Sequence, residues 1–158
     1  PQKGVSFKDI TPLLLHPPTF QMAIDRLVEA FEAEGVDKVA AIDARGFLFA
    51  GTVAYLLYAG LVPIRKQGKL PSATIAQPYG LEYGHGILEM HADAVLPGER
   101  VLVIDDVLAT GGTAEAAAEL VRKQEGCIVG FGFLIELLSL KGRQKLAGER
   151  IVSLLSYD

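Results

Sequence analysis

Apolar residues recur at helical spacing in one part of the chain and crowd together in another. Between residues 20 and 31 they return at every third or fourth position, which predicts an amphipathic helix that Thr19 caps and Gly35 ends. The stretch 47–59 is almost wholly apolar and predicts a helix that is buried on most sides. A third helix is expected from about residue 113 to residue 125.

Shorter apolar runs lie between these segments and predict strands. Because strands alternate with helices, we expect the α/β fold class with a mainly parallel sheet. No repeat or charged linker divides the sequence, so residues 1–158 are expected to form a single domain. The expected strands cover residues 37–43, 61–65, 101–105, 127–137 and 151–156, with a short helix near 141–147.

Residues 66–86 interrupt this alternation. They contain four glycines and two prolines, which predicts a long loop that includes a hairpin. Long loops inside compact domains are often functional lids, so we expect residues 66–86 to form a mobile lid.

Composition narrows the class of protein. The chain has 158 residues, is 50% hydrophobic and carries a formal net charge of −4, which argues against a general nucleic-acid-binding surface. A single cysteine, Cys127, rules out an intrachain disulfide and a cysteine-based zinc cluster. The longest apolar run, at 47–60, is too short to span a bilayer, and no secretory pattern opens the chain. We expect a cytoplasmic protein with neither a nucleic acid nor a membrane as a partner.

The sequence VLVIDDVLATGGT, at 101–113, combines a buried strand with a glycine-rich turn that opens a helix. Glycines let backbone N–H groups approach an anion, threonines add hydroxyl donors, and the helix N-terminus favours negative charge. The spacing fits neither the triphosphate loop with its GK[ST] ending nor the GxGxxG dinucleotide fingerprint. We therefore predict an anion loop for a single phosphate monoester. Its residues are Ala109, Thr110, Gly111, Gly112 and Thr113.

Two adjacent carboxylates, Asp105 and Asp106, precede this anion loop. A loop that binds only phosphate gains nothing from negative charge at its mouth. Carboxylates accept hydrogen bonds from a vicinal diol, so the combination predicts recognition of a ribose 5-phosphate. The same pair also favours a bound Mg²⁺. The alternative is a metal-binding pair at a strand end beside an ordinary helix cap.

Cations gather after two other strands. Arg45 lies in a turn at 44–46, where Gly46 permits close approach of the backbone to a ligand. Arg65, Lys66 and Lys69 crowd into five residues, and we call them the cation cluster. On the sequence alone, Arg45 could instead be a surface arginine in a tight turn, and the cation cluster could be a solvated charged face.

Several stretches together carry a family resemblance. The segment 101–113 resembles the phosphoribosyl-pyrophosphate signature of the type I phosphoribosyltransferases. Five further stretches resemble the adenine phosphoribosyltransferases of that family, and the similarity runs from near Gly4 to the C-terminus. The resemblance implies the type I phosphoribosyltransferase fold, with a small N-terminal hood from about residue 1 to 15. These stretches are GVSFKDITPLL (4–14), DARGFLFA (43–50), RKQGKLP (65–71), LEYGHGILEMHADAV (81–95) and SLKGRQKL (139–146).

The implied reaction joins adenine and phosphoribosyl pyrophosphate to give AMP and pyrophosphate, with Mg²⁺, in purine salvage. Arg45 and Gly46 then belong to the pyrophosphate loop, where the resemblance suggests a cis bond between Ala44 and Arg45. The cation cluster would clamp pyrophosphate. Asp43 and Ala44 receive little weight, because family members often have Glu or Ser there.

The remaining implied roles concern the lid and the base. Glu82 and Tyr83 lie between glycines of the lid, and Glu82 would accept the proton from adenine N9 or stabilise the ribosyl cation. At the base, Phe7 would stack on adenine, Val107 would close its other face, and backbone near Ser6 would read the exocyclic amine. Lys8 stands where the family commonly has arginine, and lysine lacks the planar fork.

Two further features complete the prediction. The helix 47–59, with Tyr55 and Tyr58, holds more large apolar residues than one sheet face requires, which favours a homodimer. His85 and His91 are interpreted as structural or solvent-facing, and nothing in the sequence indicates a partner for His16.

Three alternative functions stay open. An enzyme for xanthine or guanine would share the segment 105–113 but differ near residues 6–8 and Val107. A regulator that senses phosphoribosyl pyrophosphate would need a DNA-binding face, for which an acidic single domain has little room. A plain nucleotide-binding module is the third alternative.

Overall fold

Alternating side chains on the central strands divide the hydrophobic core into two layers. In β1 (Lys38–Ile42), Val39 and Ala41 pack into one core cluster, whereas Ala40 and Ile42 pack into the other. All four side chains are at most 1% exposed, as expected for a strand covered on both faces. The computed structural model describes residues 9–81 and 84–158.

Within these described residues the strands form one seven-stranded sheet in the order β3-β4-β2-β1-β5-β6-β7. The five strands from β2 to β7 in this order are parallel to one another. The predicted α/β fold class is therefore confirmed. Besides β1, the strands are β2 (Gly60–Lys66), β3 (Thr74–Leu81), β4 (Gly84–His91), β5 (Arg100–Leu108), β6 (Cys127–Leu137) and β7 (Ile151–Tyr157).

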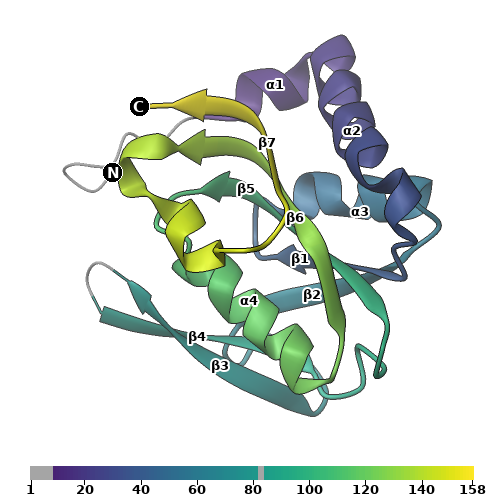
Figure 1. Cartoon of the computed structure of the whole chain (residues 1–158), viewed down its shortest axis with the longest axis vertical. Helices are drawn as coiled ribbons and strands as arrows, with labels where there is room; N and C mark the ends of the chain where they lie inside the picture. The colour runs from purple at the N-terminus through teal and green to yellow at the C-terminus, as the bar shows by residue number, and fades with distance from the viewer. Residues whose placement is uncertain (1–8, 82–83) are drawn as a thin grey trace.

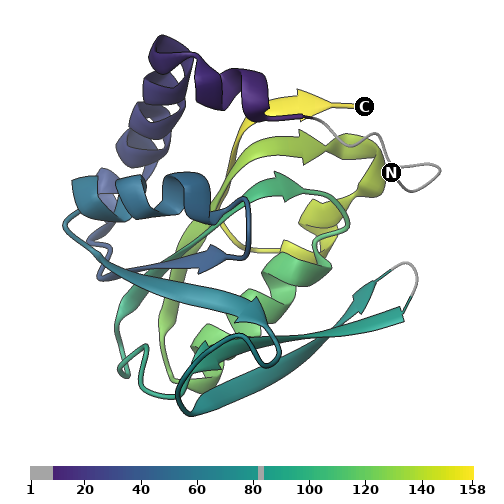
Figure 2. The same ribbon diagram turned by 180° about the vertical axis from the view of Figure 1, so that it is seen from behind.

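Helices cover the two faces of the parallel strands. Helices α2 and α3 lie on one face and α4 lies on the other, as Figures 1 and 2 show from opposite sides. None of the helices in the described part of the chain has both the length and the apolar character needed to cross a membrane. The helices are α1 (Thr11–Leu15), α2 (Pro17–Phe31), α3 (Phe47–Leu56) and α4 (Gly112–Lys123), with short 3₁₀ turns η1 (Glu32–Glu34), η2 (Leu138–Leu140) and η3 (Gly142–Leu146).

The segment expected to be a lid contains a long antiparallel hairpin. Strands β3 and β4 pair along their whole length, and β4 joins the parallel part of the sheet through β2 at Arg65 and Glu89. The predicted hairpin is confirmed, and it occupies more of residues 66–86 than the prediction of a loop implied. The end of the hairpin lies on the same side of the molecule as the carboxyl ends of β5, β6 and β7 (Figure 1).

Two predicted boundaries were wrong. Helix α2 begins at Pro17 rather than after Thr19, because proline is well suited to the first turn of a helix. Thr19 Oγ1 instead lies 2.6 Å from His16 Nδ1. The strand expected at 101–105 continues to Leu108 through its pairing with β6. Asp106 therefore also belongs to the strand, which was expected to end at Asp105.

Candidate active site

The anion loop (residues 109–113) leaves the end of β5 and opens α4. Gly111 is the residue before the helix and has a φ of 82°, a left-handed conformation that glycine adopts without strain. A Cβ on Gly111 would lie 2.5 Å from the carbonyl oxygen of Gly142, and a Cβ on Gly142 would collide with the carbonyl oxygen of Ala109. The two glycines thus let η3 support the back of the loop, and packing determines the shape of the loop.

The first turn of α4 offers donors to an anion. The first N–H groups of a helix have no intrahelical acceptor, and at Gly111 no side chain caps this helix within the described structure. Together with the helix dipole, these groups make a site suited to phosphate. The carbonyl oxygen of Gly80, near the end of the hairpin, lies 3.1 Å from the position a Cβ would take on Gly112. The hairpin therefore reaches the anion loop.

The two carboxylates lie directly before this loop and face the turn that follows β1. Asp106 is only 5% exposed, and its Oδ2 lies 2.6 Å from Arg45 Nε. That ion pair lacks the alignment of a hydrogen bond, so the buried oxygen still has capacity to accept one. Asp105 Oδ1 accepts a hydrogen bond of 2.8 Å from the Asp106 N–H. Burial raises the pKa of Asp105 well above its usual range, and the negative charge of Asp106 raises it further.

The turn at 43–46 brings Arg45 to these carboxylates because β1 and β5 are parallel neighbours. Gly46 is required there, since a Cβ would lie 2.6 Å from the Ile42 carbonyl oxygen and 3.1 Å from Asp105 Oδ1. The cis peptide bond joins Asp43 to Ala44, so the prediction of a cis bond between Ala44 and Arg45 was wrong. The Asp43 N–H still donates to Ile64 O at 2.9 Å, as in the sheet, and the chain turns only after this residue.

The cation cluster (Arg65, Lys66 and Lys69) begins at the end of β2 and is tied to the same turn. Arg65 Nε donates to Asp43 Oδ2 at 2.9 Å, and its Nη1 donates to the Lys69 carbonyl at 3.1 Å. Lys66 and Lys69 are exposed. The structure therefore joins Arg45, Gly46 and Arg65 with the acidic pair in one region, as the sequence predicts. Both arginines are already paired with carboxylates.

Of the other predicted site residues, Val107 lies in the described part of the chain. Val107 is half-buried in β5 and pairs with Ile135 of β6. Its contact with a base stays a prediction. The predicted residues Ser6, Phe7, Lys8, Glu82 and Tyr83 lie outside the described residues.

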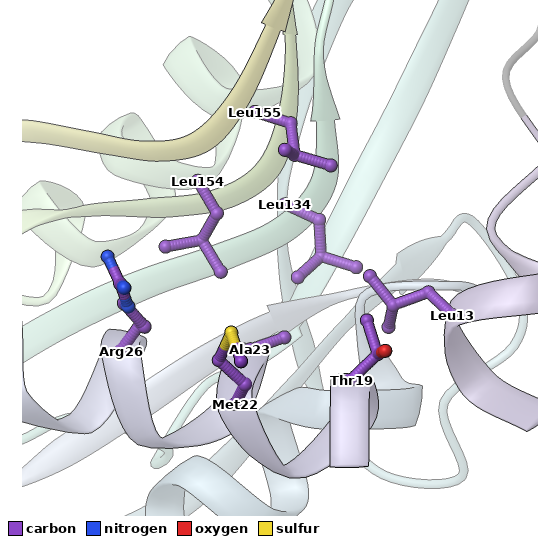
Figure 3. Close-up of a pocket in the computed structure, with 8 residues that line it drawn as sticks. All are labelled: Leu13, Thr19, Met22, Ala23, Arg26, Leu134, Leu154 and Leu155. Carbon is purple, nitrogen blue, oxygen red and sulfur yellow. The ribbon is translucent and has the colours of Figure 1, made fainter. Parts of the chain in front are cut away.

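A cavity elsewhere in the molecule has different chemistry. It measures about 280 Å³ and lies between helices α1 and α2 and the strands β6 and β7. Figure 3 shows leucines of the strands pointing toward Met22 and Ala23 of α2, with Arg26 at one side. This lining suits an apolar occupant rather than a sugar phosphate. Its residues are Leu13, Thr19, Met22, Ala23, Arg26, Leu134, Leu154 and Leu155.

Sequence reasoning missed three residues that shape the site. Asp43 received little weight, yet it holds Arg65. Gly142 supports the anion loop, and Lys145 Nζ lies 3.4 Å from the position of a Cβ on Gly112. The glycine of SLKGRQKL could have been taken as a sign of close backbone packing, but no local signal names its partner. Only the fold brings residues 142–145 beside residues 109–113.

The predicted anion loop and the acidic strand end lie side by side in the structure, an arrangement suited to a phosphorylated ribose. The family model for the phosphoribosyl transferase domain matches residues 13–150. The chain belongs to this family, which confirms the predicted resemblance and fold.

Within this family, the chain is similar to adenine phosphoribosyltransferases. The chain is 58% identical to an adenine phosphoribosyltransferase of Thermobifida fusca over 147 residues, covering 93% of this chain and 84% of the relative. The crystal structure of adenine phosphoribosyltransferase from Thermoanaerobacter pseudethanolicus matches with a TM-score of 0.96 at 50% identity, covering 99% of this chain and 91% of that one. The enzyme from Saccharomyces cerevisiae, solved with adenine and an imino-altritol bisphosphate, matches with a TM-score of 0.91 at 40% identity, covering 98% and 90%.

Proposed function

We propose that this chain transfers the 5-phosphoribosyl group of phosphoribosyl pyrophosphate to adenine, giving AMP and pyrophosphate. The observation that carries the proposal is the acidic end of β5 continuing into an anion loop that Gly111 and Gly142 shape together. A sugar with a diol and a phosphate monoester satisfies both halves of this arrangement. The adenine phosphoribosyltransferases among the relatives agree with this activity.

The ribose 5-phosphate half of the substrate fits the loop and the strand end. The N–H groups at the start of α4 and the hydroxyls of Thr110 and Thr113 would hold the 5-phosphate. The carboxylates of Asp105 and Asp106 would accept hydrogen bonds from the 2′- and 3′-hydroxyls. Holding the sugar at both ends orients its anomeric carbon, and such positioning can supply a large part of the rate enhancement.

The leaving group fits the turn at 43–46 and the cation cluster. Transfer places growing negative charge on pyrophosphate, which arginine and lysine side chains can stabilise. Arg45 and Arg65 would exchange their present carboxylate partners, Asp106 and Asp43, for the pyrophosphate oxygens. Lys66 and Lys69 are exposed and add charge to the same clamp.

The base and the lid complete the proposal. Val107 would contact one face of adenine, and Phe7 would stack on the other, with Ser6 and Lys8 near the purine edge. Glu82, with Tyr83 beside it in the lid, would take the proton from adenine N9 or stabilise the ribosyl cation. Closure of a lid over residues 66–86 would exclude water, which otherwise competes with adenine for the activated ribose.

Mg²⁺ is expected to arrive with the substrate. Over residues 9–81 and 84–158, no group of three or more His, Cys, Asp or Glu side chains could hold a metal ion. Protein sites commonly bind Mg²⁺ through one or two carboxylates together with substrate phosphates, so Asp105 and Asp106 fit a metal that pyrophosphate brings. Bound there, Mg²⁺ would neutralise charge on the leaving group.

A second copy of the chain is the proposed partner at α3. Tyr55 is 79% exposed and Tyr58 is 99% exposed, and Leu48 and Leu56 of α3 are also exposed. Large apolar side chains gathered on α3 and on the turn after it favour burial against another protein surface. Sedimentation of the wild type and of Tyr55→Glu tests this, with a dimer expected only for the wild type; a monomeric wild type at micromolar concentration would contradict it. The single-domain organisation and the cytoplasmic location stay predictions.

A substrate panel tests the activity. Pyrophosphate release is measured with phosphoribosyl pyrophosphate, Mg²⁺ and each of adenine, guanine, hypoxanthine and xanthine. We expect turnover with adenine and at least about 100-fold less with any 6-oxopurine. Groups that accept hydrogen bonds from the exocyclic amine of adenine would face the carbonyl oxygen of a 6-oxopurine and stay unpaired. Preference for guanine or xanthine would favour a sister enzyme. AMP binding without turnover of any base would favour a nucleotide-binding module or a regulator.

A further inference from the structure

Lys145 is a charged residue beside the anion loop (residues 109–113) that none of the proposed roles uses. It belongs to η3, and its Nζ lies 3.4 Å from the position a Cβ would take on Gly112, the first residue of α4. The same Nζ lies 3.8 Å from Glu115 Oε2 in the first turn of α4. We propose that Lys145 binds the 5-phosphate of the substrate and supplies the positive charge that the loop itself lacks. This inference rests on the proposed function.

The fold holds Lys145 at this position from both sides. Two residues earlier, Arg143 donates to both oxygens of Glu136, at 2.6 and 2.8 Å. Glu136 is only 3% exposed and pairs in the sheet with Leu108, the residue directly before the anion loop. On the other side, Leu146 is buried in the core beneath α4. The backbone at Lys145 is therefore held in place relative to the anion loop. The Lys145 side chain is about half exposed and can reach a ligand.

Charge balance explains why such a lysine is needed. A phosphate monoester carries a charge of about −1.5 to −2 at neutral pH, whereas residues 109–113 offer only neutral donors. Arg45 and Arg65 pair with Asp106 and Asp43 on the side assigned to pyrophosphate.

Glu115 makes the need larger, because its carboxylate lies in the first turn of α4, close to the proposed phosphate. Lys145 neutralises this charge. Its ion pair with Glu115 is long and partly exposed, so exchanging it for phosphate costs little.

Binding of AMP, ribose 5-phosphate and adenosine to Lys145→Met tests the proposal by calorimetry. We expect the variant to bind AMP and ribose 5-phosphate about tenfold more weakly, as for loss of one charge-assisted contact. Adenosine, which lacks the phosphate, should bind with unchanged affinity. In turnover, the KM for phosphoribosyl pyrophosphate should rise about tenfold while kcat stays within about threefold. Lys145→Arg should restore most of the affinity.

Lys123→Met is the matched control. It removes the same charge from the far end of α4, about 16 Å along the helix, and the wild-type Lys123 Nζ donates to the Ala76 carbonyl at 2.7 Å. AMP affinity should be unchanged in this variant. Glu115→Gln should tighten AMP binding about twofold to threefold, because it removes the competing carboxylate.

The outcomes separate the two proposals. AMP binding by Lys145→Met within about twofold of the wild type, or an equal loss for adenosine, overturns the role of Lys145 while leaving the activity intact. A wild type that binds ribose 5-phosphate but transfers no phosphoribosyl group from phosphoribosyl pyrophosphate to adenine overturns the proposed function. The role of Lys145 then depends on the phosphate-binding measurements alone. A wild type that binds neither phosphate ester overturns both.

Discussion

The two ends of the proposed substrate meet very different protein surfaces. At the 5-phosphate end, the anion loop (residues 109–113) is shaped by backbone packing between Gly111 and Gly142, and its donors are neutral. At the pyrophosphate end, the turn at 43–46 and the cation cluster offer arginines that already contact Asp106 and Asp43. The backbone of the phosphate end is thus preformed, and only Lys145 exchanges a long, partly exposed ion pair there, whereas both arginines of the pyrophosphate end must exchange carboxylate partners for ligand. Substitutions should therefore act mainly through shape at the phosphate end and mainly through charge competition at the pyrophosphate end.

Gly111→Ala should have the largest effect. Alanine would have to adopt the left-handed conformation of Gly111, at a φ of 82°, and its methyl group would lie 2.5 Å from the Gly142 carbonyl oxygen. The loop must therefore move. We expect kcat/KM for phosphoribosyl pyrophosphate to fall by about 1,000-fold, equivalent to roughly 4 kcal/mol of lost positioning. Steady-state kinetics with adenine measures this.

Gly98→Ala separates backbone strain from loss of the site. Gly98 also has a φ of 82°, but nothing lies within 4 Å of its Cβ position. It should lose about 1 kcal/mol of stability and keep wild-type kinetics. Equal kinetics for Gly111→Ala and Gly98→Ala would show that the anion loop does not need its present shape.

Arg45→Met should rank second. It removes the guanidinium near the leaving group and leaves the buried Asp106 without its ion-pair partner. We expect kcat to fall by about 100-fold, equivalent to roughly 2.7 kcal/mol. Single-turnover kinetics measures the chemical step directly. Arg26→Met is the control, because Arg26 lines the apolar cavity between α1, α2, β6 and β7, and this variant should leave kcat unchanged. An unchanged kcat for Arg45→Met would remove Arg45 from the proposed clamp.

Asp43→Asn should have a smaller effect of opposite sign. The asparagine oxygen can still accept from Arg65 Nε, so the geometry is kept, but its negative charge no longer competes with pyrophosphate. We expect pyrophosphate to bind about threefold more tightly, a change of roughly 0.7 kcal/mol. Calorimetric titration with pyrophosphate and Mg²⁺ measures it. Weaker binding would mean that Asp43 assists the ligand rather than competing with it.

Two carboxylates at the carboxyl edge, those of Asp105 and Glu136, should respond to pH in opposite directions. Burial raises the pKa of Asp105 above the value of the unfolded chain, so its contribution to stability is present at low pH and is lost as the pH rises through the folded pKa. The hydrogen bonds from Arg143 lower the pKa of Glu136, so its contribution is present above the unfolded value of 4.5 and is lost as the pH falls through the folded pKa.

Thermal unfolding of Asp105→Asn and Glu136→Gln from pH 8 to pH 4 measures this contrast. Relative to the wild type, Asp105→Asn should raise Tm at pH 8, although we expect it to weaken substrate binding, and Glu136→Gln should lower Tm. Both differences should shrink toward pH 4. A lower Tm for Asp105→Asn at pH 8 would contradict the burial of an unfavourable charge beside Asp106.

How far the sequence predicts this molecule depends on whether the signal is local. The hydrophobic pattern predicts β1, β5, β6 and the alternation with helices, because strands buried on both faces have nearly continuous apolar sequences. It does not reveal that β5 continues to Leu108, since Asp105 and Asp106 interrupt the apolar run and only pairing with β6 keeps them in the strand. The sequence also predicts a hairpin within residues 66–86, but glycines and prolines there obscure how far its strands β3 and β4 extend.

The site shows the same division. The anion loop and its acidic neighbours lie within one stretch of sequence, and their composition alone predicts a phosphate and a diol. Three contacts join segments that are distant in sequence. These are the pairing of Arg65 with Asp43, the packing of Gly142 against Gly111, and the approach of Lys145 to Gly112. Such contacts depend on the order of strands in the sheet, which no local pattern states.

A crystal structure of the chain with AMP tests the central claim most directly. We expect the phosphate oxygens within hydrogen-bonding distance of the N–H groups at 111–113, with the backbone of residues 109–113 and 142 unmoved. The ribose hydroxyls should lie on Asp105 and Asp106. A phosphate bound elsewhere, or an anion loop that rebuilds itself away from Gly142 to bind it, would contradict the account.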